Sequence, residues 1–494
     1  MTRHGSYPVD VVPPRSKYYD SGRFGRMFGN LPPFAADTPE VRAALLDIGK
    51  PQGIMDAGDK LSAGPVKLIT DPELSKKNRN STTHVAGDTF LGQFIDHDIT
   101  FDPTSSLERQ VDPELIQNFR TPGLGLDNVY GSGPNVSPYL YDQTTGGISM
   151  LIEECGTAGK SDVPRNAQGV ALIGDPRNDE NLIVSQLQTA MLRFHNAAVA
   201  HVRATTGLTH PGEVFAEAQR IVRWHYQWIV VHHFLRTTCT PAVVDDVLQR
   251  GRAFYKWKNE PFIPVEFSVG AYRFGHSQIR PSYRANFTGN PGGTPFFGMI
   301  FTKTSTPADD PDDLSGGRRA PRRFVDWPTF FDFGDGSVRP NKKIDTTLSS
   351  ALFALPGSVV AGADPTRNPA SLAQRNLLRH LTFSLPSGQR VASAMNLPVL
   401  AKRDLADLQQ YGMDDRTPLW FYVLREADVV ADGDALGPVG ARIVAEVIIG
   451  LMQGDRGSYL SQDPDWQPTL PTIDPARQGD DFLMIDLLRF AGVA

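Results

Sequence analysis

The sequence is poor in three features that would each indicate a class of protein. It has only two cysteines, Cys155 and Cys239, in 494 residues, which excludes a disulfide framework and gives no spacing typical of a structural zinc site. Its basic residues are scattered and the formal net charge is −6, so we expect no nucleic-acid binding. The most apolar late stretch, Ile443–Met452, is short and contains Glu446, so we expect no transmembrane segment.

The beginning of the chain also lacks a long apolar run. Residues 1–17 are polar and contain prolines, unlike a signal peptide. The default expectation is therefore a soluble, cytoplasmic protein, and export without a classical signal stays open. The sequence gives no indication of the oligomeric state.

Helical periodicity dominates the rest of the chain. Apolar residues recur at intervals of three or four over residues 183–198 and again over 215–229, which predicts two long amphipathic helices. Alternating strand-like runs are few and short. We therefore expect a mainly α fold with little β structure.

Long proline- and glycine-rich loops separate the helical segments. The clearest are residues 32–67, 302–328 and 454–480. No internal repeat is visible, and composition does not change sharply along the chain. We expect one large domain, residues 67–494, with residues 1–66 forming an irregular N-terminal arm packed on it.

The most informative segment predicts a helix over residues 89–99, with Asp88 as its N-cap. On this helix Gln93, Asp96 and His97 stand at positions i, i+3 and i+4, so an amide, a carboxylate and an imidazole share one face. Such a set of groups is suited to binding and splitting a small polar oxidant.

Three further motifs follow along the chain. Arg177 and Glu180 lie three residues apart, directly before the first long helix. His276 follows Gly275, which leaves room for a flat group beside the imidazole. Asn376 lies among leucines and needs a hydrogen-bond partner if it is buried. Taken singly, such an arginine is more often an ion-pair partner, and such a histidine more often a core residue.

In this order and with these separations, the motifs resemble those of the animal-type haem peroxidase (peroxidase–cyclooxygenase) superfamily, and in particular its bacterial branch. The resemblance runs from about residue 24 to residue 480, and it implies a large single-domain, multi-helix haem peroxidase fold. It also implies a haem b cofactor.

The resemblance assigns functions to individual residues. His97 matches the distal histidine, Gln93 the distal glutamine and Arg177 the distal arginine. His276 matches the proximal histidine that binds the haem iron, Asn376 the asparagine that holds it, and Arg379 an arginine that pairs with a haem propionate. Asp96 and Glu180 match the two carboxylates that form ester bonds to haem methyl groups.

The chemistry of these residues agrees with the family's activity. Hydrogen peroxide needs a base to take one proton and return it to the departing oxygen, and a histidine with an ordinary pKa of about 6.5 suits this task. Arg177 would stabilise the charge that builds on that oxygen. The implied enzyme is a peroxidase that reduces hydrogen peroxide through an oxoferryl intermediate and oxidises halides, pseudohalides or small aromatic donors.

The resemblance also implies a calcium site, from which this chain departs. The candidate ligands are Asp98, Thr121, the Gly123 carbonyl and Asp127. Gly125 stands where the family usually has an aspartate. Because calcium affinity depends on the number of anionic ligands, we expect a weakened site or none.

Two other departures bear on the substrate. Asn181 stands where one mammalian relative has a methionine that forms a third covalent link to haem, so we expect bromide, iodide, thiocyanate or phenols to be better donors than chloride. Arg273 stands where fatty-acid cyclooxygenases have a radical-forming tyrosine, which argues against that activity. A fatty-acid dioxygenase on the same haem scaffold remains the alternative.

The sequence also permits two interpretations without haem chemistry. One is a catalytically silent adhesion or recognition protein, but such a protein has no reason to keep His97, Arg177 and His276 together. The other is a non-haem metal protein that uses His97, Asp98 and Asp102, which leaves Arg177 and the Asn376 segment without a function.

Overall fold

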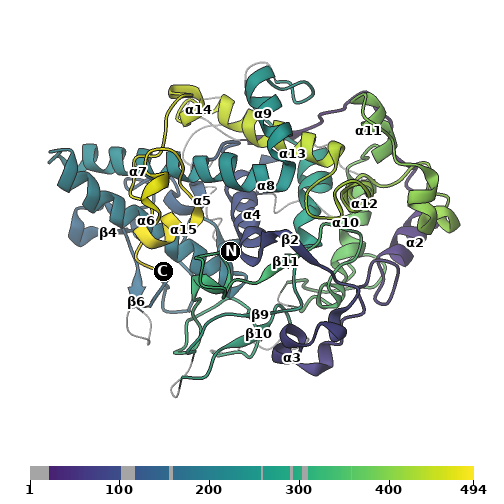
Figure 1. Cartoon of the computed structure of the whole chain (residues 1–494), viewed down its shortest axis with the longest axis horizontal. Helices are drawn as coiled ribbons and strands as arrows, with labels where there is room; N and C mark the ends of the chain where they lie inside the picture. Colours follow the sequence, from purple (N-terminus) through teal and green to yellow (C-terminus); the bar gives the residue numbers. More distant parts are fainter. Residues whose placement is uncertain are drawn as a thin grey trace.

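The computed structural model is built mainly of helices, among them α4 (Ala86–Ile99), which carries His97. It describes residues 22–101, 117–118, 120–154, 160–257, 260–289, 293–302, 310–357 and 359–494. Figure 1 shows α4 near the middle of the molecule, α6 and α7 towards one end, α10 and α12 towards the other, and β9 and β10 along one edge. The expected mainly α fold is confirmed.

The other α-helices are α2 (Pro39–Ile48), α3 (Pro65–Thr70), α5 (Asp127–Tyr130), α6 (Leu182–Thr205), α7 (Pro211–Trp228), α8 (Arg236–Cys239), α9 (Pro241–Arg250), α10 (Leu372–Thr382), α11 (Gly388–Ala394), α12 (Leu419–Ala431), α13 (Pro438–Gly454), α14 (Tyr459–Gln462) and α15 (Met484–Phe490). A π-helical segment, η7 (Ile229–Leu235), joins α7 to α8.

The strands are short and belong to small sheets. They are β1 (Gly22–Gly25), β2 (Asn80–Val85), β3 (Gln117–Asn118), β4 (Tyr141–Asp142), β5 (Ser149–Met150), β6 (Glu153–Glu154), β7 (Ser161–Asp162), β8 (Ile263–Pro264), β9 (Ser282–Arg284), β10 (Phe297–Met299) and β11 (Pro340–Lys342). β1 pairs with β3 antiparallel and with β8 parallel, while β2–β11, β4–β5, β6–β7 and β9–β10 form antiparallel pairs.

The two long amphipathic helices form as the periodicity predicts. In α6 the stripe that includes Ile183, Leu187 and Phe194 is buried. The helix begins at Leu182 because the Asn181 side chain accepts hydrogen bonds from the backbone N–H groups of residues 183 and 184, at 3.1 and 2.9 Å. This N-cap fixes the point at which the Arg177 motif passes into the helix.

Helix α4 begins earlier than the sequence analysis expects. It starts at Ala86 rather than at residue 89, and Asp88 lies in its first turn instead of at the N-cap. The Asp88 carboxylate accepts a hydrogen bond from the Val85 N–H at 2.9 Å. An acidic residue three positions into a helix accepts from the backbone N–H of the N-cap residue, as in a capping box, so the correction moves the helix start by about one turn.

Helix α2 is a second correction, because it lies within a stretch expected to be loop. Its start signals are Thr38, whose side chain accepts from the Val41 N–H at 3.3 Å, and Pro39 in the first turn. It packs against α10 so closely that a Cβ on Gly49 would lie 2.6 Å from the Gln374 nitrogen. The division of the chain after residue 66 stays a prediction.

The core is centred on α13, which is buried on nearly all sides. Glu446 is fully buried within this apolar helix, where its carboxylate accepts 2.8 Å hydrogen bonds from the backbone N–H groups of residues 253, 254 and 255. The acid therefore ties the chain after α9 to the core. Among the helices that the structure describes, none combines the length and the apolar character needed to cross a membrane.

Candidate active site

One side of the candidate site joins α4 to the short 3-10 helix η6 (Pro176–Asp179). His97 is buried on α4, and its Nδ1 lies 2.7 Å from Oδ1 of Asn178 in η6. Arg177 reaches the same place, because its Nη2 donates to the carbonyl oxygens of His97, at 3.3 Å, and of Thr100. The structure therefore brings together the predicted histidine and arginine, which are far apart in sequence.

A buried carboxylate holds the arginine in position. Asp175 accepts from Nε and Nη2 of Arg177 at 3.1 and 2.8 Å, and from Nη2 of Arg120 at 2.5 Å. Burial opposes ionisation of Asp175, but the two guanidinium groups outweigh it and lower the pKa of the carboxyl. The sequence alone indicates no function for Asp175 or Arg120.

The other predicted residues of this side share a face of α4, as expected. Gln93 accepts from the Asn181 side chain at 3.3 Å, and Asp96 accepts from the Thr100 hydroxyl at 3.0 Å. The pKa of His97 is lowered to about 4, first by burial and then by the charge of Arg177. Its imidazole is therefore neutral near pH 7, the form that accepts a proton.

The opposite side is built on η9 (Ala271–His276) and α10. The Asn376 amide lies 2.7 Å from Nδ1 of His276. One turn further along α10, His380 donates to the Asn376 carbonyl at 2.9 Å and accepts from the Trp420 N–H at 2.9 Å. The Trp420 indole N–H donates in turn to the Arg273 carbonyl at 3.0 Å. A closed set of neutral hydrogen bonds thus links α10, α12 and η9.

One cavity touches both sides. It is lined by Phe24, Asp96, Thr100, Arg177, Val265, Ser268, Val269, Arg273, Arg379 and Phe383. A Cβ on Gly275, next to His276, would meet nothing within 4 Å, so the space beside this imidazole is open. Burial, then the charge of Arg273, lowers the pKa of His276 to about 3. The imidazole is neutral, as a metal-binding histidine must be.

The charges of the lining favour an acidic ligand. Three arginines, Arg177, Arg273 and Arg379, face one carboxylate, Asp96. Arg273 donates its Nε to the Ser268 carbonyl at 3.0 Å, and no carboxylate pairs with it among the described residues. Arginine is well suited to bind carboxylates, so the lining fits a flat group that carries two of them, such as haem. Arg273 therefore joins Arg379 as a second arginine that could bind a carboxylate of the cofactor, a function that the sequence alone did not indicate.

Glu180 lies deep in the protein, yet its side chain is exposed. Burial raises its pKa to about 7, although Arg177 opposes the shift. The geometry is compatible with the predicted ester link without testing it.

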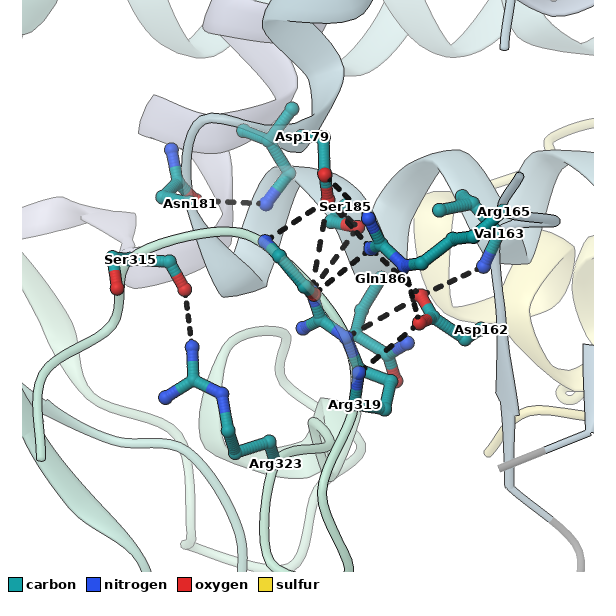
Figure 2. A network of polar contacts seen from close by, with 12 residues as sticks. Asp162, Val163, Arg165, Asp179, Asn181, Ser185, Gln186, Ser315, Arg319 and Arg323 are labelled. Carbon is teal, nitrogen blue, oxygen red and sulfur yellow. Dashed lines mark hydrogen bonds and ion pairs between the residues drawn. The ribbon is translucent and has the colours of Figure 1, made fainter. Parts of the chain in front are cut away.

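A network of ion pairs fixes the chain on either side of Glu180 (Figure 2). Arg165 donates to both oxygens of Asp179, at 2.6 and 2.8 Å, and also to Asp162 at 2.9 Å. Arg319 lies 3.3 Å from Asp162 and 3.7 Å from Asp179. The loop that carries Arg319 approaches the motif so closely that a Cβ on Gly316 would lie 1.5 Å from the Asp179 carbonyl oxygen. Only glycine fits there.

The candidate calcium ligands lie near one another. Asp98 is fully buried; its Oδ2 accepts from the Leu126 N–H at 3.1 Å, and its Oδ1 has no partner in the described part of the chain. Asp127 accepts from the Thr121 N–H at 3.2 Å. Burial and the neighbouring Asp127 raise the pKa of Asp98 well above its usual range. The unpartnered oxygen of Asp98, close to the Asp127 carboxylate, is the kind of group that a bound cation would satisfy.

An arginine reaches the position where the family's further aspartate is missing. A Cβ on Gly125 would lie 3.5 Å from Nη2 of Arg223 and 3.4 Å from Oδ1 of Asp127. The described residues contain no group of three or more His, Cys, Asp or Glu side chains arranged to hold a metal ion. Asp102, invoked for a non-haem site, lies outside the described residues, and so does Cys155.

The chain is similar to peroxidases in sequence. The animal haem peroxidase family model matches residues 108–305. Human thyroid peroxidase is 25% identical over 381 residues, which cover 69% of this chain and 38% of that protein. Chorion peroxidase of Drosophila melanogaster is 24% identical over 358 residues, covering 67% and 40%. The chain thus matches about two fifths of the length of these curated relatives.

The fold is also similar to solved structures. Peroxidase A from Dictyostelium discoideum superposes with a TM-score of 0.62 at 16% identity, over 96% of this chain and 94% of that one. Fatty acid alpha-dioxygenase from Oryza sativa superposes with a TM-score of 0.55 at 14% identity, over 96% and 85%. The family match over residues 108–305, the relatives and the fold all agree with the resemblance of the motifs to the animal haem peroxidase superfamily.

Proposed function

We propose that the chain is a haem-dependent peroxidase that reduces hydrogen peroxide and oxidises small donors. The observation that carries this proposal is the cavity with three lining arginines, placed where the His97 and His276 segments meet. His276 would bind the iron. In this structure the Asn376 amide faces Nδ1 of His276 through its Nδ2; turned by 180°, it would accept from Nδ1–H and leave Nε2 for the metal. Arg379 and Arg273 would hold the propionates.

The proton chemistry belongs to His97 and Arg177. Neutral His97 takes one proton from hydrogen peroxide and returns it to the departing oxygen. Arg177 is fixed by Asp175, so its guanidinium stabilises developing charge without first having to reorient. Haem, when bound, supplies the iron that stores the two oxidising equivalents. Gln93 would help to position the peroxide.

The donor is proposed to be a halide other than chloride, a pseudohalide or a small aromatic molecule. Asn181 supports this choice, because it cannot form the additional haem link and serves instead as the N-cap of α6. Ester links through Asp96 and Glu180 are part of the proposal. Acid–acetone extraction after peroxide treatment tests them: haem that leaves the protein freely would count against the links.

A haem titration followed by peroxide tests the function as a whole. The full chain should bind one equivalent of haem with a sharp absorption band. It should then change spectrum within the mixing time of a stopped-flow instrument on addition of hydrogen peroxide, and return to its first spectrum when bromide or a phenol is added. Haem that binds at several weak sites, or a bound haem inert to peroxide, would contradict the proposal.

A fatty-acid dioxygenase is the second candidate, since the fold is also similar to a fatty acid alpha-dioxygenase. Arg273, at the position of the radical-forming tyrosine in cyclooxygenases, counts against a cyclooxygenase-like reaction and leaves a dioxygenase of another kind open. Oxygen uptake by the haem-loaded protein with palmitate or linoleate separates the candidates. We expect no uptake above that of free haem.

A further inference from the structure

We propose that Asn178 and Gln188 are positioning residues that fix the tautomer of His97 through a directed chain of side-chain amides. Nδ1 of His97 lies 2.7 Å from Oδ1 of Asn178. Nδ2 of Asn178 donates to Oε1 of Gln188 at 2.8 Å, and Nε2 of Gln188 donates to the Asn128 carbonyl oxygen at 3.1 Å. The chain therefore runs from α4 through η6 and α6 to a backbone carbonyl in α5.

The carbonyl at the end sets the direction of every bond before it. A backbone carbonyl only accepts hydrogen bonds, so Gln188 must turn its NH₂ towards Asn128. Its oxygen then faces Asn178, which must offer its own NH₂ and turn Oδ1 towards the imidazole. That oxygen in turn requires a hydrogen on Nδ1. The proton of neutral His97 is thereby held on Nδ1, and Nε2 keeps its lone pair.

Burial makes the direction costly to reverse. Asn178, Gln188 and Asn128 are all fully buried, so water cannot replace a lost partner, and an unpaired buried polar group costs about 1–3 kcal/mol. The Asn128 carbonyl, at which the chain of amides ends, packs directly against Gly174, where a Cβ would lie 2.6 Å from the carbonyl oxygen. Turning one amide alone would place two donors or two acceptors face to face.

The tautomer matters because it decides which nitrogen is the base. Nε2 of His97 has no hydrogen-bond partner in the described part of the chain, so it is the nitrogen left to meet peroxide. The opposite tautomer would carry a hydrogen there and could accept no proton. This inference rests on the proposed function for its consequence, but the tautomer itself is a property of the folded chain.

Two matched pairs of variants test the chain in the full-length protein. Asn178→Asp keeps the acceptor for Nδ1–H, whereas Asn178→Leu is of similar size and removes it. Gln188→Glu keeps the acceptor for Asn178, whereas Gln188→Leu removes both bonds. Nitrogen NMR of ¹⁵N-histidine-labelled protein, without haem and as the diamagnetic carbon monoxide complex, reports which ring nitrogen is protonated. The His97→Gln variant identifies the signals.

The wild type and Asn178→Asp should show a protonated Nδ1 and an unprotonated Nε2. Asn178→Leu should show a mixture of tautomers, and the rate constant for its reaction with peroxide should fall about 10- to 100-fold, as when a hydrogen-bond partner of a functional histidine is removed. Gln188→Leu should lie between the wild type and Asn178→Leu.

A protonated Nε2 in the wild type, or an unchanged tautomer in Asn178→Leu, would overturn the inference. If the tautomers are as expected but the haem-loaded protein does not react with hydrogen peroxide, the proposed function is wrong. The inference about the amide chain would then still hold. A retained tautomer with a reduced rate in Asn178→Leu would assign Asn178 a packing function only.

Discussion

The two sides of the cavity are held in opposite ways. On the His97 side, charges set the geometry: Asp175 binds Arg177 and Arg120, and the adjacent Asp179 binds Arg165. On the His276 side, neutral hydrogen bonds through Asn376, His380 and Trp420 do this work, together with close packing. Both sides keep a neutral imidazole, and the His97 side in addition holds the charged Arg177 with a buried carboxylate.

This contrast follows from what each side is proposed to do. A fixed guanidinium lowers the barrier for a reaction that develops negative charge, and buried counter-ions are needed to keep it ionised and still. A histidine that binds a metal must stay unprotonated on one nitrogen while its other nitrogen is held. A carboxylate beside His276 would favour the imidazolium, and the described residues place none within salt-bridge distance of it.

The largest effect is expected on the neutral side. His276→Ala should abolish stable haem binding, because no other side chain would hold the iron. A haem titration followed by absorbance measures this. His210→Ala, which changes an exposed histidine, is the control and should bind haem as the wild type does. Tight haem binding by His276→Ala would place the cofactor elsewhere.

On the charged side, His97→Ala should keep haem and lose reactivity. Removing a general acid–base group costs about 10²- to 10⁴-fold in rate, so the second-order rate constant with hydrogen peroxide should fall by that factor. Stopped-flow absorbance of the haem-loaded variant gives the number. A variant that loses haem and reactivity together would show that His97 supports the cavity rather than the proton transfer.

The ion pairs of Figure 2 should account for much of the stability on the charged side. Asp179→Ala leaves Arg165, which has no exposed side-chain surface, without one of its two carboxylate partners. Breaking a buried pair costs about 3–5 kcal/mol, and urea unfolding of the haem-free chain measures this loss. Asp310→Ala breaks a half-exposed pair with Arg322 and should cost about 0–1 kcal/mol. Equal losses would remove the contrast between buried and exposed pairs.

The sequence indicated the candidate site residues better than it indicated the residues that hold them in place. Spacing placed Gln93, Asp96 and His97 on one helix face, because α-helical geometry is local. The partners that hold the site came from distant segments, such as Gln188 in α6. Gln188 is a polar residue beside the apolar stripe of α6, and nothing in the local sequence showed that it would reach η6, since long-range contacts leave no local pattern.

Helix boundaries show the same limit. Proline and glycine in residues 32–67 suggested a loop, but Pro39 follows a capping threonine and begins α2. Proline favours the first turn of a helix as strongly as it disfavours the interior. Only the packing of α2 on α10 decides between the two.

The pH dependence of stability should sharpen the comparison within the charged side. The ion pair with Arg165 outweighs burial and lowers the pKa of Asp179. Burial instead raises the pKa of Glu180 to about 7, from an ordinary value of 4.5. A raised carboxyl pKa favours folding below pH 4.5, and this contribution is lost as the pH rises through about 7. The free energy of unfolding of the haem-free wild type, minus that of Glu180→Gln, should therefore fall over this range. Urea unfolding at several pH values measures both slopes, and equal slopes would mean that Glu180 does not titrate as a buried acid.

The smallest effect is expected at the candidate cation site next to His97, where one of the family's usual carboxylates is missing. Asp98 and Asp127 supply two carboxylates, while Arg223 brings a positive charge close to Gly125. Ligand binding to the native state raises stability in proportion to the logarithm of ligand concentration over Kd. We therefore expect millimolar calcium to raise the Tm of the wild type by little, and that of Gly125→Asp by more, because a third carboxylate increases affinity. Gly125→Asn is the control, since it adds bulk without charge. A gain in Gly125→Asp that is the same with calcium and with a chelator would mean that the new carboxylate pairs with Arg223 instead, and that this guanidinium already takes the place of the metal.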